Sequence, residues 1–531
     1  MASAEPRLED LPPGRHAFVT IGVILGMLMQ VLDITIANVA LPHIQASLGA
    51  TPETISWVLT SYILASAVAI PITGWLADRI GRKPLFVGAA IGFAGASALC
   101  AIAQNIGEMV FFRACQGVAG AFLVPLAQST LLDINPPEKR GSAMALFGAG
   151  VMVGPILGPV LGGWLTQDYD WRWVFLINLP VGVLTALLTW RSMPSFPKMK
   201  RSFDLFGFAL LGLSLAALQL MLDRGSQLDW FSSWEIRIEA GVAIAGAWMF
   251  LVHMLTRRDA LFDRRMFRDR NFSAGLFFMA ITGLMLFAGL SLLPPLLQNL
   301  LGYSSLQAGL LTAPRGVGTL VTMVIVGRLV GRIDARLLIG AGICLLALSL
   351  YQMSQFTLGM DSRPVIVSGV MQGLALGLIF VPLNTIAFAT LDARYRTAGT
   401  SLFNLARSIG GSIGISIMSA LLIRNIQISH ADLAAFITPH ALSEIGRSLA
   451  MNGRTAALAA TVDGEINRQA SMIAFIDDFR LMMMLALCTL PLVPLLRSPR
   501  RGATGQAGRP PQKNDLSVMR LLRPSHLPPA K

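Results

Sequence analysis

Four ionisable side chains stand inside long apolar stretches of this 531-residue chain: Asp33, Arg113, Arg315 and Arg407. Taking a charged group out of water is costly, so an ionisable residue at such a place is a functional hypothesis by default. A carboxyl group can take up and release a proton, whereas a guanidinium keeps its proton and acts only by biasing an acid nearby. These residues therefore indicate proton exchange rather than bond-making chemistry.

Asp33 is the residue best suited to carry a proton. Burial penalises the charged form of a carboxyl group, which suits a group that must bind and release protons. Gln30 shares its helix face, and Gln116 shares the face of Arg113, because residues three or four apart are neighbours on a helix. The alternative is that Asp33 lies near the membrane surface and bonds to water. Whether Arg113 reaches Asp33 depends on the tertiary structure.

The excess of arginines over acids in the apolar stretches bears on the substrate. Three buried arginines against one aspartate disfavour a purely cationic ligand, since unpaired buried charges of one sign repel more of the same sign. We therefore expect a pocket for neutral or anionic amphiphiles, such as fatty-acid-like compounds. The alternative is that the arginines are structural and bond to helix carbonyls. The candidate pocket residues are Gln30, Gln116, Arg315, Asn404 and Arg407.

The composition places the chain in a membrane. It is 54% hydrophobic and only 13% charged, about half the charged share of soluble domains. The four cysteines and six histidines show neither paired spacing nor metal spacing, so no disulfide framework and no metal site is expected. The net charge of +13 lies in short loops and the tail rather than in a basic domain, which argues against nucleic acid as a partner.

Apolar segments of about 20 residues, the length that crosses a bilayer as a helix, recur along the chain. They predict an all-α polytopic membrane protein with fourteen transmembrane helices. The first six lie near Phe18–Leu41, Ile55–Leu76, Leu85–Ala103, Met109–Leu132, Ser142–Leu165 and Trp173–Trp190. The other eight lie near Leu205–Leu222, Ile236–Leu255, Phe272–Leu297, Leu306–Val330, Leu337–Phe356, Pro364–Leu391, Thr397–Ile423 and Phe479–Leu496.

The distribution of basic residues orients these helices. Cytoplasmic loops carry an excess of Lys and Arg, and all six lysines fall in alternate loops or the tail, on one predicted side: Lys83, Lys139, Lys198, Lys200, Lys513 and Lys531. Both termini are therefore expected in the cytoplasm.

The predicted domains follow from the spans. Residues 1–16 form a cytoplasmic segment, 17–191 a six-helix bundle, 192–271 two inserted helices with cytoplasmic loops, and 272–497 a second six-helix bundle. The second bundle includes a partly helical extracytoplasmic loop at 424–476. The tail, 498–531, is polar and rich in Pro and Gly, a composition typical of disorder.

A charged turn between the second and third helices, GWLADRIGRKPLF at Gly74 to Phe86, has a partial echo in GRLVGRIDAR at Gly327 to Arg336. The echo indicates two related halves. The turn resembles the signature of the major facilitator superfamily, and the resemblance implies that fold in a 6+2+6 arrangement. It also implies a cytoplasmic latch that must break for inward opening, formed by Gly74, Asp78, Arg79, Gly81 and Arg82. The alternative is that these charges only enforce orientation.

The fifth helix carries glycines every four residues, which line one face and permit close packing. They are Gly150, Gly154, Gly158 and Gly162, with Pro155 expected to help bend the helix. This pattern resembles the antiporter motif of the superfamily's exporters; the alternative is a generic small-residue interface. LDITIANVALPHI at Leu32 to Ile44 and DWRWVFLINLPVGV at Asp170 to Val183 resemble the fourteen-helix drug:proton antiporters of the Emr/Qac type.

The resemblance implies proton-coupled efflux of drugs or other toxic amphiphiles by alternating access, with Asp33 and Arg113 as the proton-coupling residues. No cofactor is expected, since the proton gradient supplies the energy and no phosphate-binding GxxxxGK[ST] loop occurs. The implied partners are small amphiphiles and the lipid of a cell inner membrane. If the host cell has two membranes, the resemblance also implies a periplasmic adaptor and an outer-membrane channel. An uptake symporter is the nearest alternative, and a membrane-embedded enzyme or receptor the more remote one, as no catalytic cluster is evident.

Overall fold

The structure, a computed structural model, describes residues 12–196, 198, 202–257, 259–437 and 455–497. Among these residues the elements are helices, and the one β pairing is an isolated bridge between Val330 and Ile333. They belong to one compact unit that ends at Arg497. The predicted disordered tail, most of the N-terminal segment and residues 438–454 of the predicted outer loop lie outside the described residues.

The N-terminal half comprises the helices up to α10. They are α1 (Pro13–Leu48), α2 (Pro52–Ile55), α3 (Trp57–Ala69), η2 (Ile70–Ile72), α4 (Thr73–Ile80), α5 (Arg82–Ile102), α6 (Ile106–Gly120), α7 (Leu123–Ile134), η3 (Pro137–Lys139), α8 (Arg140–Asp168), α9 (Trp173–Leu176) and α10 (Asn178–Ser192).

Two inserted helices precede the C-terminal half, which begins at α13. The inserted pair is α11 (Leu205–Arg224) and α12 (Trp234–Thr256), with the short turns η4 (Trp230–Ser232) and η5 (Met266–Arg268). The C-terminal half comprises α13 (Arg270–Pro295), η6 (Leu296–Leu300), α14 (Ser305–Leu329), α15 (Ala335–Met353), α16 (Arg363–Ala387), η7 (Ala393–Tyr395), α17 (Arg396–Ala435), α19 (Thr455–Thr489) and η8 (Leu490–Leu495).

Thirteen helices of the described part are long and apolar enough to cross a membrane. The fourteenth predicted span falls on α19 and η8, where Asp477, Asp478 and Arg480 lower the apolar character of the helix. Several spans are broken rather than straight: a 3-10 turn containing Pro71 joins α3 to α4, and a π-helical turn follows Pro294 and Pro295 at the end of α13. Proline removes a backbone donor, which explains these breaks.

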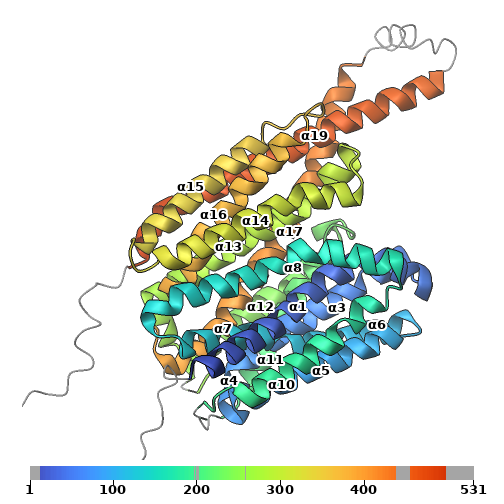
Figure 1. Cartoon of the computed structure of the whole chain (residues 1–531). Coiled ribbons are helices and arrows are strands. Elements are labelled where there is room, and N and C mark those ends of the chain that lie inside the picture. Colours follow the sequence, from blue (N-terminus) through green and yellow to red (C-terminus); the bar gives the residue numbers. More distant parts are fainter. Residues whose placement is uncertain (1–11, 197, 199–201, 258, 438–454, 498–531) are drawn as a thin grey trace, which may run out of the picture. The chain divides into compact units, whose positions relative to one another are not determined.

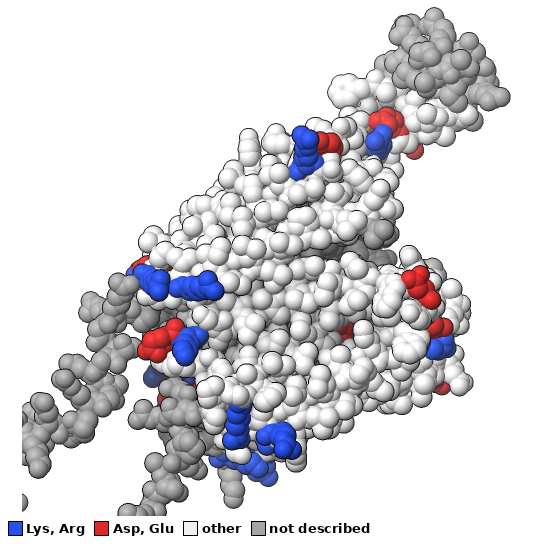
Figure 2. Space-filling model, in the orientation of Figure 1, with Lys and Arg blue, Asp and Glu red and all other residues white. Residues whose placement is uncertain are grey.

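Basic side chains gather at one end of the helix array, which we call the basic end; the other is the opposite end. The basic end includes Arg82, Arg140, Arg270 and Arg396. Figure 2 shows a flank almost free of charge between them. The start of α1 and the segment that ends at Arg497 both lie at the basic end. Arg15 donates from Nε to the carbonyl of Ser192 at 2.8 Å, and Asn271 at the start of α13 donates to the carbonyl of Arg497 at 2.9 Å.

The two halves repeat one set of helix contacts. In the N-terminal half α1 packs on α8, α3 on α6, and α5 on both α6 and α10. In the C-terminal half α13 packs on α17, α14 on α16, and α15 on both α16 and α19. The inserted α11 contacts α3 of one half and α17 of the other, so it lies against both.

The segment after the thirteenth predicted span is more helical than its sequence indicated. The span was expected to end near Ile423, but α17 continues to Ala435, and α19 begins at Thr455, well before the predicted last span. Figure 1 shows α17 and α19 extending together past the neighbouring helices. The exposed Asp463 of α19 lies 2.9 Å from Nε2 of His430 on α17 and helps to join the two extensions. The polar composition of this segment concealed its helical periodicity.

At the basic end, Asp204 anchors the inserted pair. Its carboxylate accepts from the amides of Gly207 (3.0 Å) and Leu261 (3.1 Å) and lies 2.9 Å from Nε2 of His253. Burial alone raises the pKa of this carboxyl group, but the backbone hydrogen bonds and His253 outweigh burial, so the pKa of Asp204 is lowered. The charged carboxylate therefore joins α11, α12 and the linker that follows them.

Candidate functional site

Asp33 is completely enclosed within the N-terminal half. Its side chain is 1% exposed and receives hydrogen bonds from three other side chains. Arg113 Nη1 donates to Oδ2 at 2.6 Å, while Gln116 Nε2 and Asn178 Nδ2 donate to Oδ1 at 2.9 and 2.8 Å. The structure thus brings the two predicted proton-coupling residues into one ion pair. A water-bonded Asp33 near the surface is excluded for this conformation.

Arg113 makes further contacts, while its Nη2 has no hydrogen-bond partner in the described part of the chain. Its Nη1 also donates to Gln116 Oε1 at 2.8 Å, and its Nε donates to the carbonyl of Val58 at 3.1 Å. The guanidinium lies over the ring of Tyr62, 4.4 Å from the centroid. The charged pair therefore depends on α1, α3 and α6 together, and a movement of any one of them changes its geometry.

Sequence reasoning missed Asn178 and Ser97, which complete the network. Asn178, the first residue of α10, is 3% exposed and also donates to Ser97 Oγ of α5 at 3.0 Å. The signal was present in the motif around Asp170 to Val183, which was used only to identify relatives. Gln116, a predicted pocket residue, belongs to this network in the present conformation.

The glycine stripe of α8 packs directly on the helix that carries Asp33. A Cβ added at Gly150, Gly154, Gly158 and Gly162 would lie 2.3, 2.4, 2.1 and 3.1 Å from Met27, Val31, Thr35 and Val39 respectively. Thr35 Oγ1 also donates to the carbonyl of Gly154 at 3.1 Å. At Gly154 and Gly158 a Cβ would collide with Val31 and Thr35, so glycine is required there for the close packing of α8 on α1. α8 is a continuous helix; the side chain of Pro155 lies outside the described residues.

The predicted latch region joins the two halves at the basic end, but through an acid that the sequence analysis did not select. Asp133, at the end of α7, accepts from Arg82 of the predicted latch and from Arg396 of α17. The acid is 8% exposed. Asp78 is half-buried on α4, and Arg79 is exposed. The sequence signal for Asp133 was an acid in LLDINPPEKR, between an apolar helix and a basic turn.

Two glycines of the related turns make equivalent contacts between the halves. A Cβ at Gly74 would lie 2.9 Å from Ala398 of α17, and one at Gly327 would lie 2.6 Å from Ala145 of α8. Ser142 Oγ also donates to the carbonyl of Gly327 at 3.2 Å. Gly81 has φ +100°, which only glycine adopts readily, and it separates α4 from α5. The basic end is therefore closed in this conformation.

A buried amide bridge extends this closure into the helix array. Gln128 of α7 donates to Asn384 Oδ1 of α16 and accepts from Asn404 Nδ2 of α17, both at 2.6 Å. All three side chains are at most 5% exposed. The predicted pocket residue Asn404 is thus engaged between the halves in this state.

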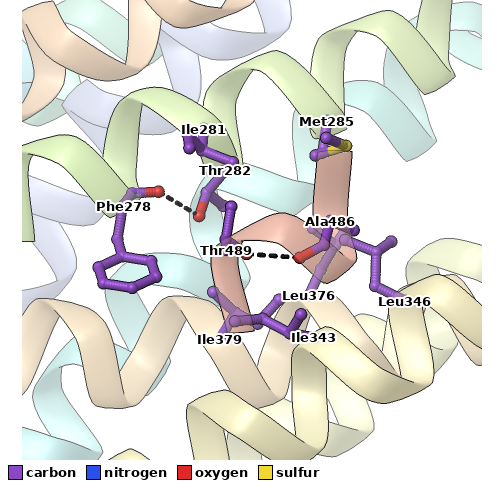
Figure 3. Close-up of a pocket in the computed structure, with 10 residues that line it drawn as sticks. All are labelled: Phe278, Ile281, Thr282, Met285, Ile343, Leu346, Leu376, Ile379, Ala486 and Thr489. Carbon is purple, nitrogen blue, oxygen red and sulfur yellow. Dashed lines mark hydrogen bonds between the residues drawn. The ribbon is translucent and has the colours of Figure 1, made fainter. Parts of the chain in front are cut away.

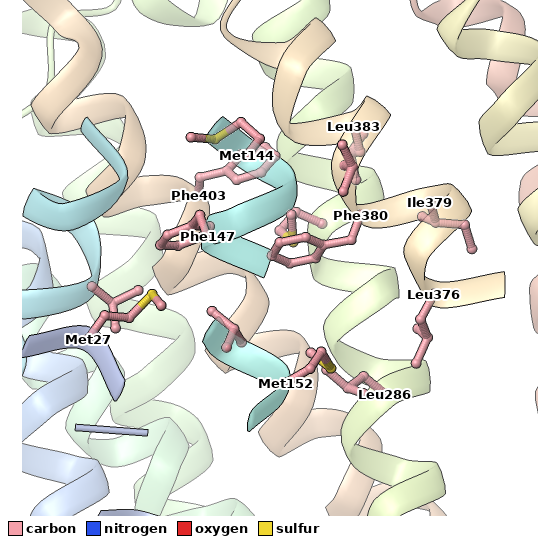
Figure 4. Packing of buried hydrophobic residues seen from close by; sticks show 14 of the residues in the cluster. Met27, Met144, Phe147, Met152, Leu286, Leu376, Ile379, Phe380, Leu383 and Phe403 are labelled. Carbon is pink, nitrogen blue, oxygen red and sulfur yellow. The ribbon is translucent and has the colours of Figure 1, made fainter. Parts of the chain in front are cut away.

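Apolar side chains surround these polar contacts. Phe147 of α8 stacks on Phe380 of α16 with ring centroids 6.3 Å apart, and methionines of α1 and α8 pack nearby (Figure 4). Met27, Met144 and Met152 belong to the same cluster. Flexible methionines adapt to ligands of different shape, so this cluster is suited to a variable apolar partner.

The C-terminal half contains the two other predicted arginines. Arg315 of α14 is 5% exposed and donates from Nη2 to the carbonyl of Leu286 at 3.4 Å. Arg407 of α17 is half-buried, and its Nε has no hydrogen-bond partner in the described part of the chain. Neither forms an ion pair with a described acid. Both contact α13, at Gly289 and Gly283 respectively.

The sequence-based tally of buried charges was incomplete. It placed one acid against three arginines, but Asp133, Asp204 and Asp478 are buried as well. Asp133 and Asp204 lie at the basic end, at the boundaries between helices and loops. At such positions the sequence does not predict burial. Asp478 was placed just outside the last span, but α19 begins earlier and buries it.

A narrow apolar cavity lies inside the C-terminal half, between α13, α15, α16 and α19 (Figure 3). Its two polar side chains bond to their own helices: Thr282 donates to Phe278 at 2.7 Å and Thr489 to Ala486 at 2.6 Å. No cluster of three or more His, Cys, Asp or Glu able to hold a metal occurs among the described residues.

Known proteins resemble this chain in sequence and in fold. The family model described as Major Facilitator Superfamily matches residues 23–415. The fatty acid resistance protein FarB of Neisseria gonorrhoeae is 37% identical over 93% of this chain and 99% of its own length. The multidrug export protein EmrB of Escherichia coli is 38% identical over 81% and 85% respectively.

Solved structures share the fold at low sequence identity. The human organic anion transporter MFSD10 matches with a TM-score of 0.58 at 17% identity, covering 90% of this chain and 100% of that protein. The proton:xylose symporter XylE matches with a TM-score of 0.55 at 14% identity, covering 91% and 96%. The chain is thus a multi-pass membrane transporter that belongs to the major facilitator superfamily and, within it, to the family of fourteen-helix drug:proton antiporters.

Proposed function

We propose that this protein exports drugs or other toxic amphiphiles from the cell in exchange for protons. The observation that carries the proposal is the closed network around Asp33. In it the carboxylate forms an ion pair with Arg113, with Oδ2 and Nη1 2.6 Å apart. A proton on Asp33 removes the charge that holds Arg113, so protonation and the packing of α1, α3 and α6 are linked. The names of the relatives EmrB and FarB support export as the direction.

The basic end faces the cytoplasm in this proposal. The excess of Lys and Arg there agrees with the orientation rule for membrane proteins. The contacts of Asp133, Gly74 and Gly327 close that end, so the conformation is one that does not admit substrate from the cytoplasm. Inward opening separates Asp133 from Arg396 and Gly74 from Ala398. The two halves then rock around the centre, as in other repeat-built transporters.

The substrates are neutral or anionic amphiphiles. Arg315 and Arg407 lie in the C-terminal half without a described acidic partner, and an anionic head group can supply the missing charge. The methionine and phenylalanine cluster between the halves accommodates the apolar part. The membrane is the inner membrane of a bacterium. A periplasmic adaptor and an outer-membrane channel are the proposed protein partners, and the proton gradient takes the place of a cofactor.

Proteoliposomes test direction and substrate together. With purified protein and an imposed proton gradient, we expect substrate to move against the proton flow, and to reverse when the gradient is reversed. Movement of substrate in the same direction as protons identifies an uptake symporter instead. A panel of anionic detergents and cationic dyes then tests charge preference. Strong dye transport without anion transport contradicts the anionic pocket.

A further inference from the structure

Asp478 is a buried acid that the proposed coupling site does not use. It lies on α19 with a relative exposure of 1%, and neither carboxylate oxygen has a hydrogen-bond partner in the described part of the chain. It belongs to a buried face of α19 that is otherwise apolar. The other members of that face are Ala474, Phe475, Phe479, Met482 and Ala486.

Aromatic and apolar residues close this site toward the opposite end. The ring of Phe479, the next residue, lies 6.2 Å from that of Phe356, which follows the end of α15. Met353 in the last turn of α15 is 2% exposed. The buried neighbours of Asp478 on its own helix face are apolar and therefore cannot solvate a charge.

The ionisable groups on the elements packed against α19 are engaged or exposed elsewhere. On α19 itself, Asp477 pairs with Arg480 at 3.4 Å, Asp463 with His430 of α17 at 2.9 Å, and Glu465 with Arg468 at 3.7 Å.

On the neighbours, Arg270 of α13 donates to Leu495 at 2.9 Å, Arg336 of α15 pairs with Asp334 at 3.2 Å, and Arg396 of α17 pairs with Asp133. Cys344 and Tyr351 of α15, with Arg424 and Asp432 of α17, are not buried, and Arg407 forms no ion pair with a described acid. The turns η6 and η8 contain no ionisable residue.

A carboxylate in this position has no charged partner among those of residues 12–437 and 455–497 that the structure describes, and this decides its protonation state. An isolated ionised carboxylate in an apolar interior costs several kcal/mol even after relaxation, whereas the neutral acid forfeits only ordinary hydrogen bonds. A bound proton therefore stabilises Asp478 where no described side chain does.

The last helix of the N-terminal half, α10, begins with a neutral amide, Asn178. Asn178 follows the buried Phe175 by three residues, just as Asp478 follows Phe475 by three. The helices α10 and α19 pack against the equivalent partners α5 and α15. In one half this helix donates to an acid on the first helix of the half; in the other, the helix carries the acid itself.

We propose that Asp478 is a second proton-binding site of the transporter, which holds its proton in this conformation and releases it when α19 shifts and exposes the carboxyl group. The cavity of Figure 3 is lined by Ala486 of α19, two turns along the same helix face. This inference rests on the proposed proton exchange and adds a site to it.

Carbodiimide labelling tests the protonation state on the wild-type protein. Dicyclohexylcarbodiimide reacts with protonated carboxyl groups in apolar surroundings, and mass spectrometry locates the adduct. We expect modification of Asp478 in preference to the adjacent Asp477, with labelling that falls as pH rises and when substrate is transported. An Asp478 that stays unlabelled at every pH overturns the proposal.

Transport assays test the role of the site. Asp478→Asn retains the shape of the protonated acid, so we expect it to catalyse substrate exchange at equal pH while losing at least about tenfold in transport driven by a proton gradient, a change of about 1.4 kcal/mol. Asp478→Glu restores driven transport in part, and Asp477→Asn, the matched control, behaves as wild type. If Asp478→Asn is driven like wild type, Asp478 is a structural acid and this inference fails alone. If wild type itself shows no proton-driven transport, the proposed function fails.

Discussion

Each half of the protein buries a carboxyl group in its helices, but the two groups have opposite surroundings. Asp33 receives hydrogen bonds from Arg113, Gln116 and Asn178, whereas Asp478 has no partner among the described residues. The arginines differ in the same way, since Arg113 pairs with Asp33, whereas Arg315 pairs with no described acid. A shared fold thus carries an ion pair in one half, and in the other an acid and arginines without an ion-pair partner among the described residues. In the two proposals above, both halves take part in proton exchange, whereas the arginines without a described acid lie in the C-terminal half and are proposed to meet an anionic ligand.

The largest expected effect distinguishes the paired arginine from the unpaired one. Arg113→Leu leaves Asp33 as an uncompensated buried charge, and we expect it to lower the free energy of unfolding by about 3–5 kcal/mol. Arg315→Leu removes a charge that has no acid partner, so stability stays the same or rises, while export of anionic substrates falls by about tenfold. Thermal unfolding in detergent and export assays measure both. Equal destabilisation by the two variants would break the comparison.

The contact at the basic end should give the next effect, because it joins the halves. Asp133→Asn weakens its bonds to Arg82 and Arg396, and a hydrogen bond to a charged group contributes about 1.5–3 kcal/mol. We expect the protein to open at this end more often. A cysteine at the buried Thr400, in a background without the native cysteines, should then react faster with a maleimide. Asp392→Asn is the control, because that exposed acid pairs only with Arg394 of its own loop; the same rate in all proteins would show that Asp133 closes nothing.

Close packing at glycines is a feature that the two halves share, in contrast to their buried charges. A Cβ at Gly158 would lie 2.1 Å from Thr35, and one at Gly410 of α17 would lie 1.9 Å from the carbonyl oxygen of Ala280 on α13. Overpacking typically costs about 1–3 kcal/mol, so Gly158→Ala and Gly410→Ala should both lower the unfolding temperature. Gly163→Ala, with nothing within 4 Å, should not. Tolerance of Gly158→Ala alone would mean that packing, like charge, differs between the halves.

The fold was largely predictable from the sequence because apolar length and basic loops are local signals. Thirteen of the predicted spans correspond to helices that can cross a membrane, and Gly158 and Gly162 revealed the close packing of α8. Which side chains meet was not predictable. Asp133 and Asn178 acquire their hydrogen-bond partners only through tertiary contacts. Asp478 was placed outside the last span because Asp477, Asp478 and Arg480 together resemble the charged boundary of a span. The pairing of Asp33 with Arg113 was a possibility that only the packing of α1 on α6 could settle.

The smallest effect concerns a partnered acid outside the spans. The pKa of Asp204 is lowered in the folded protein, so its charged form adds stability at neutral pH, and that contribution is lost as the pH falls through the folded pKa. Asp204→Asn should therefore cost about 1 kcal/mol at pH 7, and the difference from wild type should shrink in acid. Hydrogen exchange at the Gly207 amide measures this loss. Asp259 is an exposed acid of the linker after α12, so Asp259→Asn should leave exchange unchanged at every pH. An equal effect there would remove the special role of Asp204.

The most direct test of the central claim is the number of protons that the purified protein releases when substrate binds, measured with a pH-sensitive dye in weak buffer. If the network around Asp33 couples proton and substrate, wild type releases protons into the medium. Asp33→Asn, which keeps the shape but cannot ionise, then releases fewer while still binding substrate. Equal release from wild type and Asp33→Asn would contradict the account, because the pair of Asp33 and Arg113 would then be structural only.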